Sequence, residues 1–444
     1  MAAPTTVPAA TSALLARFRT VRAATLAFTA PLSPEDMMVQ SCGEASPVKW
    51  HLAHTTWFFE TFVLTPFASG YKPFHKDFHW LFNSYYNSLG DIPAKNLRSS
   101  FSRPPLDDIL AYRSHVDQAI AELLEEDLGD REFDVLSRIV LGLEHEQQHL
   151  ELAATDIKHA LFTNPLHPVY TVSENLGAPR LASETWDRTT QHFQSFAGGL
   201  VEIGVSPDPT DPLAFAFDNE TPRHKVYLEP FQLANRLVTV CDYLAFIEDD
   251  GYTRPELWLS EGWTTSRTES WQSPLYWTRD KERIFTLHGF LRMQDLLNTP
   301  VCHLSFFEAD AFARWSGCRL PTEFEWEHAA LQTPHPRSAN MLETGSFHPT
   351  CLSSRSAAEG FASALPLSQI YGDVWEWTSS PYTGYPGYKP LPGALGEYNG
   401  KFMSSQIILR GGSCVTPATH IRPTYRNFFH PATRWQFSGL RLAK

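Results

Sequence analysis

The chain has 444 residues and a formal net charge of −13, and 43% of its residues are hydrophobic. This length predicts two or three domains with cores of their own. The acidic balance argues against binding of DNA or RNA through a basic surface, and no apolar run approaches the ~20 residues of a membrane-spanning helix. The unusual value is the share of aromatic residues, 13%.

The first 160 residues predict four amphipathic helices. Apolar residues recur at spacings of three and four in four segments, 14–28, 48–64, 106–124 and 133–161. Four such segments predict an antiparallel helical bundle. Between the second and third helices lies an aromatic stretch, 69–104, with no clear period. Loops of this length inside a compact domain are functional or disordered, and the aromatic content argues against disorder here.

The composition changes after Leu161. Residues 162–192 contain Asn-Pro, His-Pro and Gly-Ala-Pro, which are typical of a linker. Beyond them, short apolar strands alternate with turn residues, and two further helices are predicted over 240–248 and 306–316. We therefore predict a helical domain over 12–165, a linker over 166–192 and an irregular α+β domain over 193–444.

The cysteines and the first residues bear on the compartment. The six cysteines are scattered, and none forms a Cys-x-x-Cys pair. This spacing favours free thiols in a reducing compartment. The first residues lack the charged start and apolar core of a secretory signal. Together these features predict a cytoplasmic protein.

The helix predicted over 133–161 carries the motif EHEQQHLE at 144–151. His145 and His149 are four residues apart, so both imidazoles project from one face and can share a metal ion. A solvated histidine-rich face is the alternative. The apolar neighbours Leu143, Leu150 and Ile157 favour a helix packed in a bundle, and bundle cores often hold metals.

The same motif contains the HExxH pattern of zinc proteases. In that interpretation His145 and His149 bind zinc and Glu146 is the general base. The residues that follow, LELAATD, lack the third histidine of one such class, and the predicted linker begins before a later helix could supply an acidic ligand. A zinc hydrolase is therefore the weaker alternative.

A third histidine is available from the second helix, which contains WHLAH at 50–54. Either His51 or His54 can face the bundle centre, and the spacing leaves both open. Three neutral histidines leave three adjacent positions on a ferrous ion, which suits activation of O₂ beside a bound substrate.

These motifs resemble a known family. The segments LAH at 52–54, LFNSYY at 81–86 and HEQQHLE at 145–151 are similar to the DinB-like domain of the sulfoxide synthases of ergothioneine biosynthesis (EgtB type). Four C-terminal segments resemble the formylglycine-generating-enzyme/sulfatase-modifying-factor domain, which has a C-type-lectin-like fold. They are GCRLPTEFEWE at 317–327, YGDVWEWT at 371–378, LRGGS at 409–413 and GLRL at 439–442. The resemblance implies a DinB-like four-helix bundle followed by an α+β domain.

The resemblance also implies an activity. Members are non-haem Fe(II) enzymes that join the sulfur of a thiol to C2 of the imidazole of hercynine (Nα-trimethylhistidine), with O₂ as co-substrate and a sulfoxide as product. By motif, the iron ligands are His54, His145 and His149, and His51 is not a ligand. The count fits, since thiolate, imidazole and O₂ require three open positions.

The resemblance implies a tyrosine as proton donor near the metal. In one subgroup a loop pair equivalent to Tyr85 and Tyr86 supplies it, and in another the C-terminal domain does. Because this chain has the pair, we assign it to the first subgroup. A proton donor suits a step in which oxygen is reduced. The alternative is two packed aromatic residues in a structured loop.

Several residues are candidates for substrate binding. The segment YRNFFH at 425–430 resembles the family's substrate loop, with Asn427 and Phe428 as contacts, and aromatic rings attract a quaternary ammonium group. Gln148 is expected to reach the hercynine carboxylate. For the carboxylate of the thiol, the arginines of the aromatic stretch are candidates, because a guanidinium fork suits a carboxylate. We favour Arg103 and keep Arg98 open.

The thiol substrate is expected to be cysteine. Relatives that use γ-glutamylcysteine carry an acidic residue where this chain has Phe429. The alternatives are γ-glutamylcysteine, a related ovothiol- or selenoneine-type synthase, the zinc hydrolase, and a non-catalytic ligand-binding module built on the lectin-like domain. We expect small-molecule substrates, no nucleic acid, no membrane, and no metal bound at Cys414 in the C-terminal domain.

Overall fold

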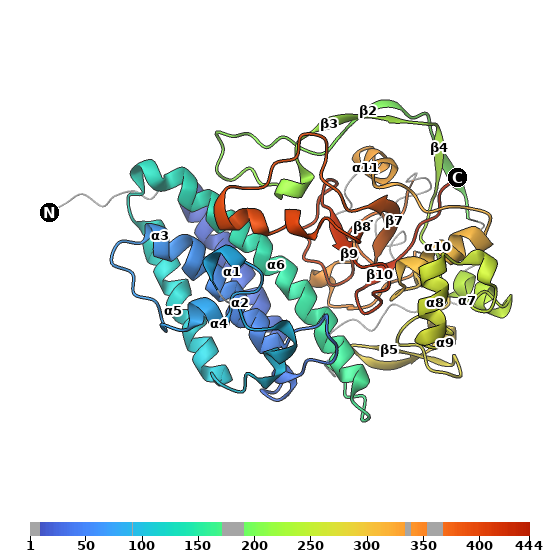
Figure 1. Ribbon diagram of the computed structural model, residues 1–444, viewed down its shortest axis with the longest axis horizontal. Coiled ribbons are helices and arrows are strands. Elements are labelled where there is room, and N and C mark those ends of the chain that lie inside the picture. Colours follow the sequence, from blue (N-terminus) through green and yellow to red (C-terminus); the bar gives the residue numbers. More distant parts are fainter. Residues whose placement is uncertain (1–8, 91, 171–190, 334–338, 353–366) are drawn as a thin grey trace. The chain divides into compact units, whose positions relative to one another are not determined.

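The computed structural model describes residues 9–90, 92–170, 191–333, 339–352 and 367–444 (Figure 1). The chain forms two compact units. One, called the helical unit below, comprises Met1–Thr163, Ser206–Asp218 and Lys389–Gly400. The other, the mixed unit, comprises Asn164–Val205, Asn219–Tyr388 and Lys401–Lys444. In the described part of the chain, no helix has the length and apolar character needed to cross a membrane.

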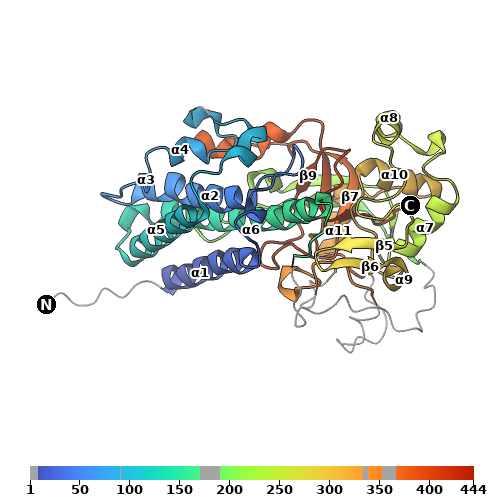
Figure 2. The same cartoon turned by 90° about the horizontal axis from the view of Figure 1, so that it is seen from below.

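The helical unit is a four-helix bundle, as predicted. Its helices are α1 (Ala9–Thr29), α2 (Val48–Phe59), α5 (Leu106–Glu125) and α6 (Glu132–Thr163). Helix α1 packs against α5 and α6, and α2 packs against the same two helices, so that the axes run side by side (Figure 2). The recurring apolar residues form the core of the bundle, with Phe18, Trp57, Ile120 and Leu143 almost fully buried.

Helix α2 ends differently from the prediction. The expected helix over 48–64 is α-helical only to Phe59, and a π-helical turn, η2 (Glu60–Leu64), completes it. Glu60 is buried at the start of that turn, and its carboxylate accepts hydrogen bonds from the hydroxyls of Tyr71 and Tyr112, each at 2.7 Å. These partners satisfy a carboxylate that would otherwise be costly to bury.

The aromatic stretch after α2 is structured over its described residues. After α3 (Thr65–Phe67), the stretch forms the short helices α4 (Phe78–Leu81), η3 (Asn87–Leu89) and η4 (Lys95–Ser100). The stretch is thus an ordered part of the bundle, as its aromatic content predicted.

Two segments that follow the bundle helices in the sequence belong to the helical unit. The segment Lys389–Gly400 contains η9 (Gly393–Glu397). The Glu397 carboxylate accepts hydrogen bonds from the backbone N–H groups of Asn87 and Ser88, each at 3.0 Å. In the segment Ser206–Asp218, the Asp218 carboxylate accepts from the Asn399 amide at 2.7 Å. The boundaries predicted at 165 and 193 stay predictions, and most of the predicted linker lies outside the described residues.

The mixed unit is built on a four-stranded sheet in the order β10-β7-β8-β9. Its strands are β7 (Trp375–Pro381), β8 (Ile407–Arg410), β9 (Asn427–Phe429) and β10 (Ser438–Gly439). Three two-stranded antiparallel pairs accompany it: β1 (Phe193–Phe196) with β4 (Phe231–Ala234), β2 (Gly199–Ile203) with β3 (His224–Leu228), and β5 (Arg283–Thr286) with β6 (Gly289–Arg292).

Two helices of the mixed unit were predicted, and three were not. Helices α7 (Val240–Glu248) and α10 (Phe306–Trp315) match the prediction. The unpredicted helices are α8 (Ser260–Thr268), α9 (Met293–Leu296) and α11 (Glu323–Leu331). The start of α11 had a signal in the sequence, since Thr322 and Glu325 form a capping box that satisfies N–H groups at the helix start.

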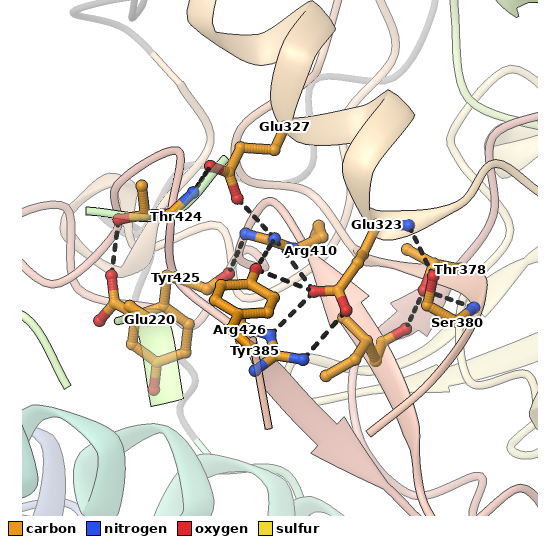
Figure 3. Close-up of polar contacts among 12 residues, drawn as sticks. Glu220, Glu323, Glu327, Thr378, Ser380, Tyr385, Arg410, Thr424, Tyr425 and Arg426 are labelled. Atoms are coloured by element: carbon orange, nitrogen blue, oxygen red, sulfur yellow. Dashed lines mark hydrogen bonds and ion pairs between the residues drawn. The ribbon is translucent and has the colours of Figure 1, made fainter. Parts of the chain in front are cut away.

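A buried ionic network fixes the start of β9 (Figure 3). The Glu323 carboxylate accepts hydrogen bonds from Arg426 at 2.8 Å and from Arg410 at 3.1 Å, and Glu327 accepts from Arg410 at 2.7 Å. Arg426 and Arg410 are fully buried, so each charge is paired inside the unit. Arg426 is part of the predicted substrate loop and immediately precedes Asn427. The network therefore fixes the position of that loop.

Candidate metal centre

Three histidines of the helical unit meet in the bundle core. His54 comes from α2, and His145 and His149 come from α6. All three are buried, and one nitrogen of each lies within 4.8 Å of the nitrogens of the others. Among the described residues, this is the one such group of histidine, cysteine or acidic side chains. The structure thus brings together the three residues that the family resemblance selected.

Several ring nitrogens of this group lack partners in the protein. Within the described part of the chain, His54 Nε2 and both ring nitrogens of His145 are buried without a hydrogen bond. Burial lowers the pKa of His145 to about 3, although the charge of Glu146 opposes it. Burial, and then the other histidines, hold the pKa of His54 and of His149 well below the usual range. All three are therefore neutral at pH 7, which is the form that binds a metal, and a bound metal would satisfy His54 Nε2 and one nitrogen of His145.

The orientation of His54 is set by its neighbours. Its Nδ1 donates a hydrogen bond to the Phe82 carbonyl oxygen at 2.7 Å, which leaves Nε2 without a proton and free for a metal. The ring stacks between Trp50, at 4.6 Å between centroids, and Trp57, at 5.3 Å. Since Phe82 belongs to the aromatic stretch, that stretch helps to orient a candidate metal ligand.

Glu146 has a different environment, although it follows His145 directly. Its carboxylate accepts hydrogen bonds from Arg22 Nη1 at 2.7 Å, from Thr25 Oγ1 at 2.8 Å, and from Arg113. Burial raises the pKa of Glu146, but the charges of Arg113 and Arg22 outweigh this effect and lower it to about 2. An ionised carboxylate that is already paired with two guanidinium groups cannot serve as the general base of a zinc hydrolase.

The predicted tyrosine pair packs beside the histidines. The Tyr86 ring lies 5.4 Å from the ring of Trp57, which itself stacks on His54, and 4.7 Å from Tyr85. The Tyr86 hydroxyl is buried and meets no partner at hydrogen-bonding geometry among the described residues. Burial, and then the nearby hydroxyls of Tyr85 and Tyr398, raise the pKa of Tyr86 well above its usual value. The group is therefore a protonated phenol at pH 7.

Tyr398 is a neighbour of this group that the sequence did not point out. It lies in the segment Lys389–Gly400, its hydroxyl donates a hydrogen bond to Gln148 Oε1, and its ring centroid is 5.5 Å from that of His145. The Phe217 ring stacks on it at 5.3 Å. No local pattern marks Tyr398, because 250 residues separate it from Gln148.

The two candidate arginines differ in their surroundings. Arg98 is buried, its guanidinium stacks on Trp50 at 3.5 Å, and it donates hydrogen bonds to Ser46 Oγ at 2.8 Å and to Ser84 Oγ at 3.0 Å. Burial lowers the pKa of Arg98 to about 10, which leaves it charged at pH 7. Arg103 is exposed. Since Trp50 also stacks on His54, the structure places Arg98, rather than the favoured Arg103, beside the histidines.

The remaining predicted contacts belong to the mixed unit. Asn427, Phe428 and Phe429 form β9 and are half-buried. Phe428 stacks on Tyr382 with centroids 4.0 Å apart, and Phe429 meets Trp435 edge to face at 5.5 Å. Their role toward a substrate stays a prediction.

Comparison with known proteins identifies the family. Residues 179–444 match the sulfatase-modifying factor enzyme 1-like domain. The chain belongs to this family. Residues 17–153 match the DinB superfamily, so both domain types occur in the expected order.

The relatives of this family member include named enzymes. The chain is 36% identical to a hercynine oxygenase of Mycolicibacterium smegmatis over 263 residues, which cover 55% of this chain and 59% of the relative. It is also 36% identical to a hercynine oxygenase of Mycobacterium tuberculosis, with 51% and 56% covered. For ergothioneine biosynthesis protein 1 of Schizosaccharomyces pombe the identity is 30%, with 57% and 31% covered.

The matched part spans little more than half the length of the two hercynine oxygenases. Together with the two domain matches, these relatives confirm the resemblance to the EgtB-type sulfoxide synthases.

Proposed function

We propose that the protein is a non-haem Fe(II) sulfoxide synthase that uses O₂ to join the sulfur of cysteine to C2 of hercynine, giving hercynylcysteine sulfoxide. The observation that carries this proposal is the group of three buried, neutral histidines, in which His54 Nε2 and both nitrogens of His145 have no hydrogen-bond partner among the described residues. It lies in a chain whose relatives include hercynine oxygenases. Among the described residues, neither a histidine with carboxylates nor a cluster of cysteines forms a second possible metal site.

His54, His145 and His149 would hold the metal. Iron bound there would supply O₂ activation and would acidify the bound thiol. Because the three histidines are neutral, they do not cancel the positive charge of the ion. That charge would favour binding of an anionic thiolate. Trp50 and Trp57 exclude water on the His54 side, because both indoles lie against that ring.

Tyr85 and Tyr86 are the proposed proton donors. The buried Tyr86 hydroxyl holds its proton at pH 7. Its proton is thus available to a reacting oxygen atom. Tyr85 is only half-buried and lies 4.7 Å from Tyr86 between ring centroids, which suits a second group that resupplies the proton.

Two polar groups of the helical unit suit the two substrate carboxylates. The Gln148 oxygen accepts from Tyr398, so the side-chain amide N–H of Gln148 is left to donate to hercynine. Arg98 donates hydrogen bonds to two neutral hydroxyls, and its guanidinium suits the carboxylate of the thiol. In the mixed unit, Asn427 and Phe428 are the proposed contacts for hercynine, and the apolar Phe429 favours cysteine over γ-glutamylcysteine.

The proposal is tested by incubating the full chain in air with Fe(II), hercynine and either cysteine or γ-glutamylcysteine, followed by mass analysis. We expect hercynylcysteine sulfoxide with cysteine and little product with γ-glutamylcysteine. Product with γ-glutamylcysteine alone would overturn the thiol assignment. Tightly bound zinc in protein purified without added metal, together with peptidase activity, would overturn the synthase assignment.

A further inference from the structure

His51 is buried one turn before His54 on α2 but is not part of the three-histidine group. Its Nδ1 lies 2.8 Å from His149 Nδ1, and its Nε2 lies 3.0 Å from Asp156 Oδ2. Asp156 is also on α6, two turns after His149, and its Oδ2 accepts the backbone N–H of Ser46 at 2.8 Å. A continuous chain of hydrogen bonds therefore runs from a buried carboxylate to a candidate metal ligand.

The protons of this chain have one consistent arrangement. A neutral histidine that binds a metal through one nitrogen carries its proton on the other. His149 Nδ1 faces His51, so His149 Nε2 is the nitrogen left for the metal, and His149 Nδ1–H donates to His51 Nδ1. The proton of His51 is then on Nε2, where it donates to the Asp156 carboxylate.

The reverse arrangement fails at both ends. If His51 Nδ1–H donated to His149, the proton of His149 would be on Nε2 and would block that nitrogen from the metal. The unprotonated His51 Nε2 would then face the Asp156 carboxylate at 3.0 Å, an acceptor against an acceptor. The contact geometry thus selects the tautomers of both histidines.

We propose that His51 and Asp156 are positioning residues that fix the tautomer of His149 and transmit the negative charge of Asp156 to the metal. The other ligands lack such support. His54 donates to the neutral Phe82 carbonyl, and His145 has no hydrogen bond among the described residues. His149 is therefore the most strongly electron-donating of the three ligands.

This proposal rests on the proposed function only in requiring a metal ion at the three histidines. It does not depend on hercynine or cysteine. Its consequences are a higher affinity for a divalent metal and a lower midpoint potential for bound iron, since a more electron-donating ligand favours Fe(III) over Fe(II).

Three variants of the full chain separate the parts of the proposal. Asp156→Asn keeps the shape and an acceptor oxygen but removes the charge. His51→Asn keeps an acceptor for His149 Nδ1–H but is too short to reach Asp156. His51→Phe removes both hydrogen bonds. His303→Asn is the matched control, because His303 is a buried histidine of the mixed unit whose Nδ1 bonds to the Gln436 carbonyl.

The readouts are Co(II) affinity, from titration of its visible absorption, and the midpoint potential of bound iron. We expect Co(II) affinity to fall about tenfold in Asp156→Asn and His51→Asn, and about a hundredfold in His51→Phe. The midpoint potential should rise in all three variants, and the control should match the wild type in both measurements.

Two results would overturn the proposal. One is wild-type affinity and potential in Asp156→Asn and His51→Phe. The other is a loss of affinity with an unchanged potential in all three variants, which would mean that the two residues only support the local fold. If the variants behave as expected but no sulfur–imidazole product forms in the wild type, this proposal stands and the proposed function fails.

Discussion

His145 and Glu146 are neighbours on α6, both are fully buried, and they have opposite surroundings. The Glu146 carboxylate has two arginines and a threonine as partners, whereas neither ring nitrogen of His145 has one among the described residues. Folded proteins satisfy nearly all buried polar groups. The protein partners of Glu146 therefore account for its burial. The ring nitrogens of His145 have no such partners, and a bound metal ion would supply one.

The mixed unit contains a second buried acid whose charge is paired. Glu323 is a buried acid paired with two buried arginines, like Glu146, although the two units share no elements. Neither acid has capacity left for chemistry, since each guanidinium fork occupies its oxygens. Burial of a charged group is thus no sign of function by itself in this protein, and the presence or absence of partners is the informative observation.

The largest expected effect is that of His145→Ala. This change should abolish binding of Fe(II) and thiol-dependent O₂ uptake, because it removes a metal ligand. Thiol-dependent O₂ uptake that persists in this variant would show that the ligand assignment is wrong.

Replacement of Tyr85 and Tyr86 tests the proposed proton donors. In Tyr86→Phe and Tyr85→Phe we expect the rate of sulfoxide formation to fall by about 10²-fold, the lower range for loss of a general acid. Without the donor, bound thiol should instead be oxidised to a sulfinic acid. Mass analysis gives the ratio of the two products. An unchanged ratio in both variants would contradict the proposed role.

Glu146→Gln tests the buried ion pairs of Glu146. The change leaves Arg113 buried without its anion, while Arg22 keeps Asp117 at 2.6 Å, so the unfolding free energy should fall by about 3–5 kcal/mol. Urea denaturation measures this loss, and Glu323→Gln in the mixed unit is the matched control with the same expected direction. If Glu146 were a general base, stability would stay near the wild-type value while activity was lost.

The arginines give a smaller effect. Loss of a charged hydrogen bond costs about 1.5–3 kcal/mol, so Arg98→Ala should raise KM for the thiol by roughly tenfold to a hundredfold with little change in KM for hercynine. Arg103→Ala is the matched control and should leave both values near the wild type. The opposite result would restore Arg103 as the thiol contact.

The last expected effect is a pH dependence of stability. The pKa of Glu146 is about 2 in the folded protein against an ordinary value of 4.5. Its contribution is therefore fully present above pH 4.5 and is lost as the pH falls from 4.5 toward 2. Urea denaturation across this range should show a shallower fall in Glu146→Gln than in the wild type, and equal slopes would contradict the ion pairing.

Local patterns predicted much of this molecule. The spacing of apolar residues predicted the four bundle helices, α7 and α10, because a helix buries one face at a period that the sequence displays. It missed α8, α9 and α11, which lie among loops. The π-helical turn at Glu60 was missed as well, because its partners Tyr71 and Tyr112 lie outside the helix.

By itself, the sequence determined the two domain types, the bundle and the pair of histidines four residues apart on one helix. Each of these depends on contacts within a helix or on a contiguous motif. The spacing left His51 and His54 open, and the family resemblance selected His54. Only the tertiary structure decided that His51 bonds to Asp156, that Glu146 is paired with Arg22 and Arg113, and that Tyr398 meets Gln148. The physical reason is that a side chain's partners in a packed core come from other elements, up to 250 residues away.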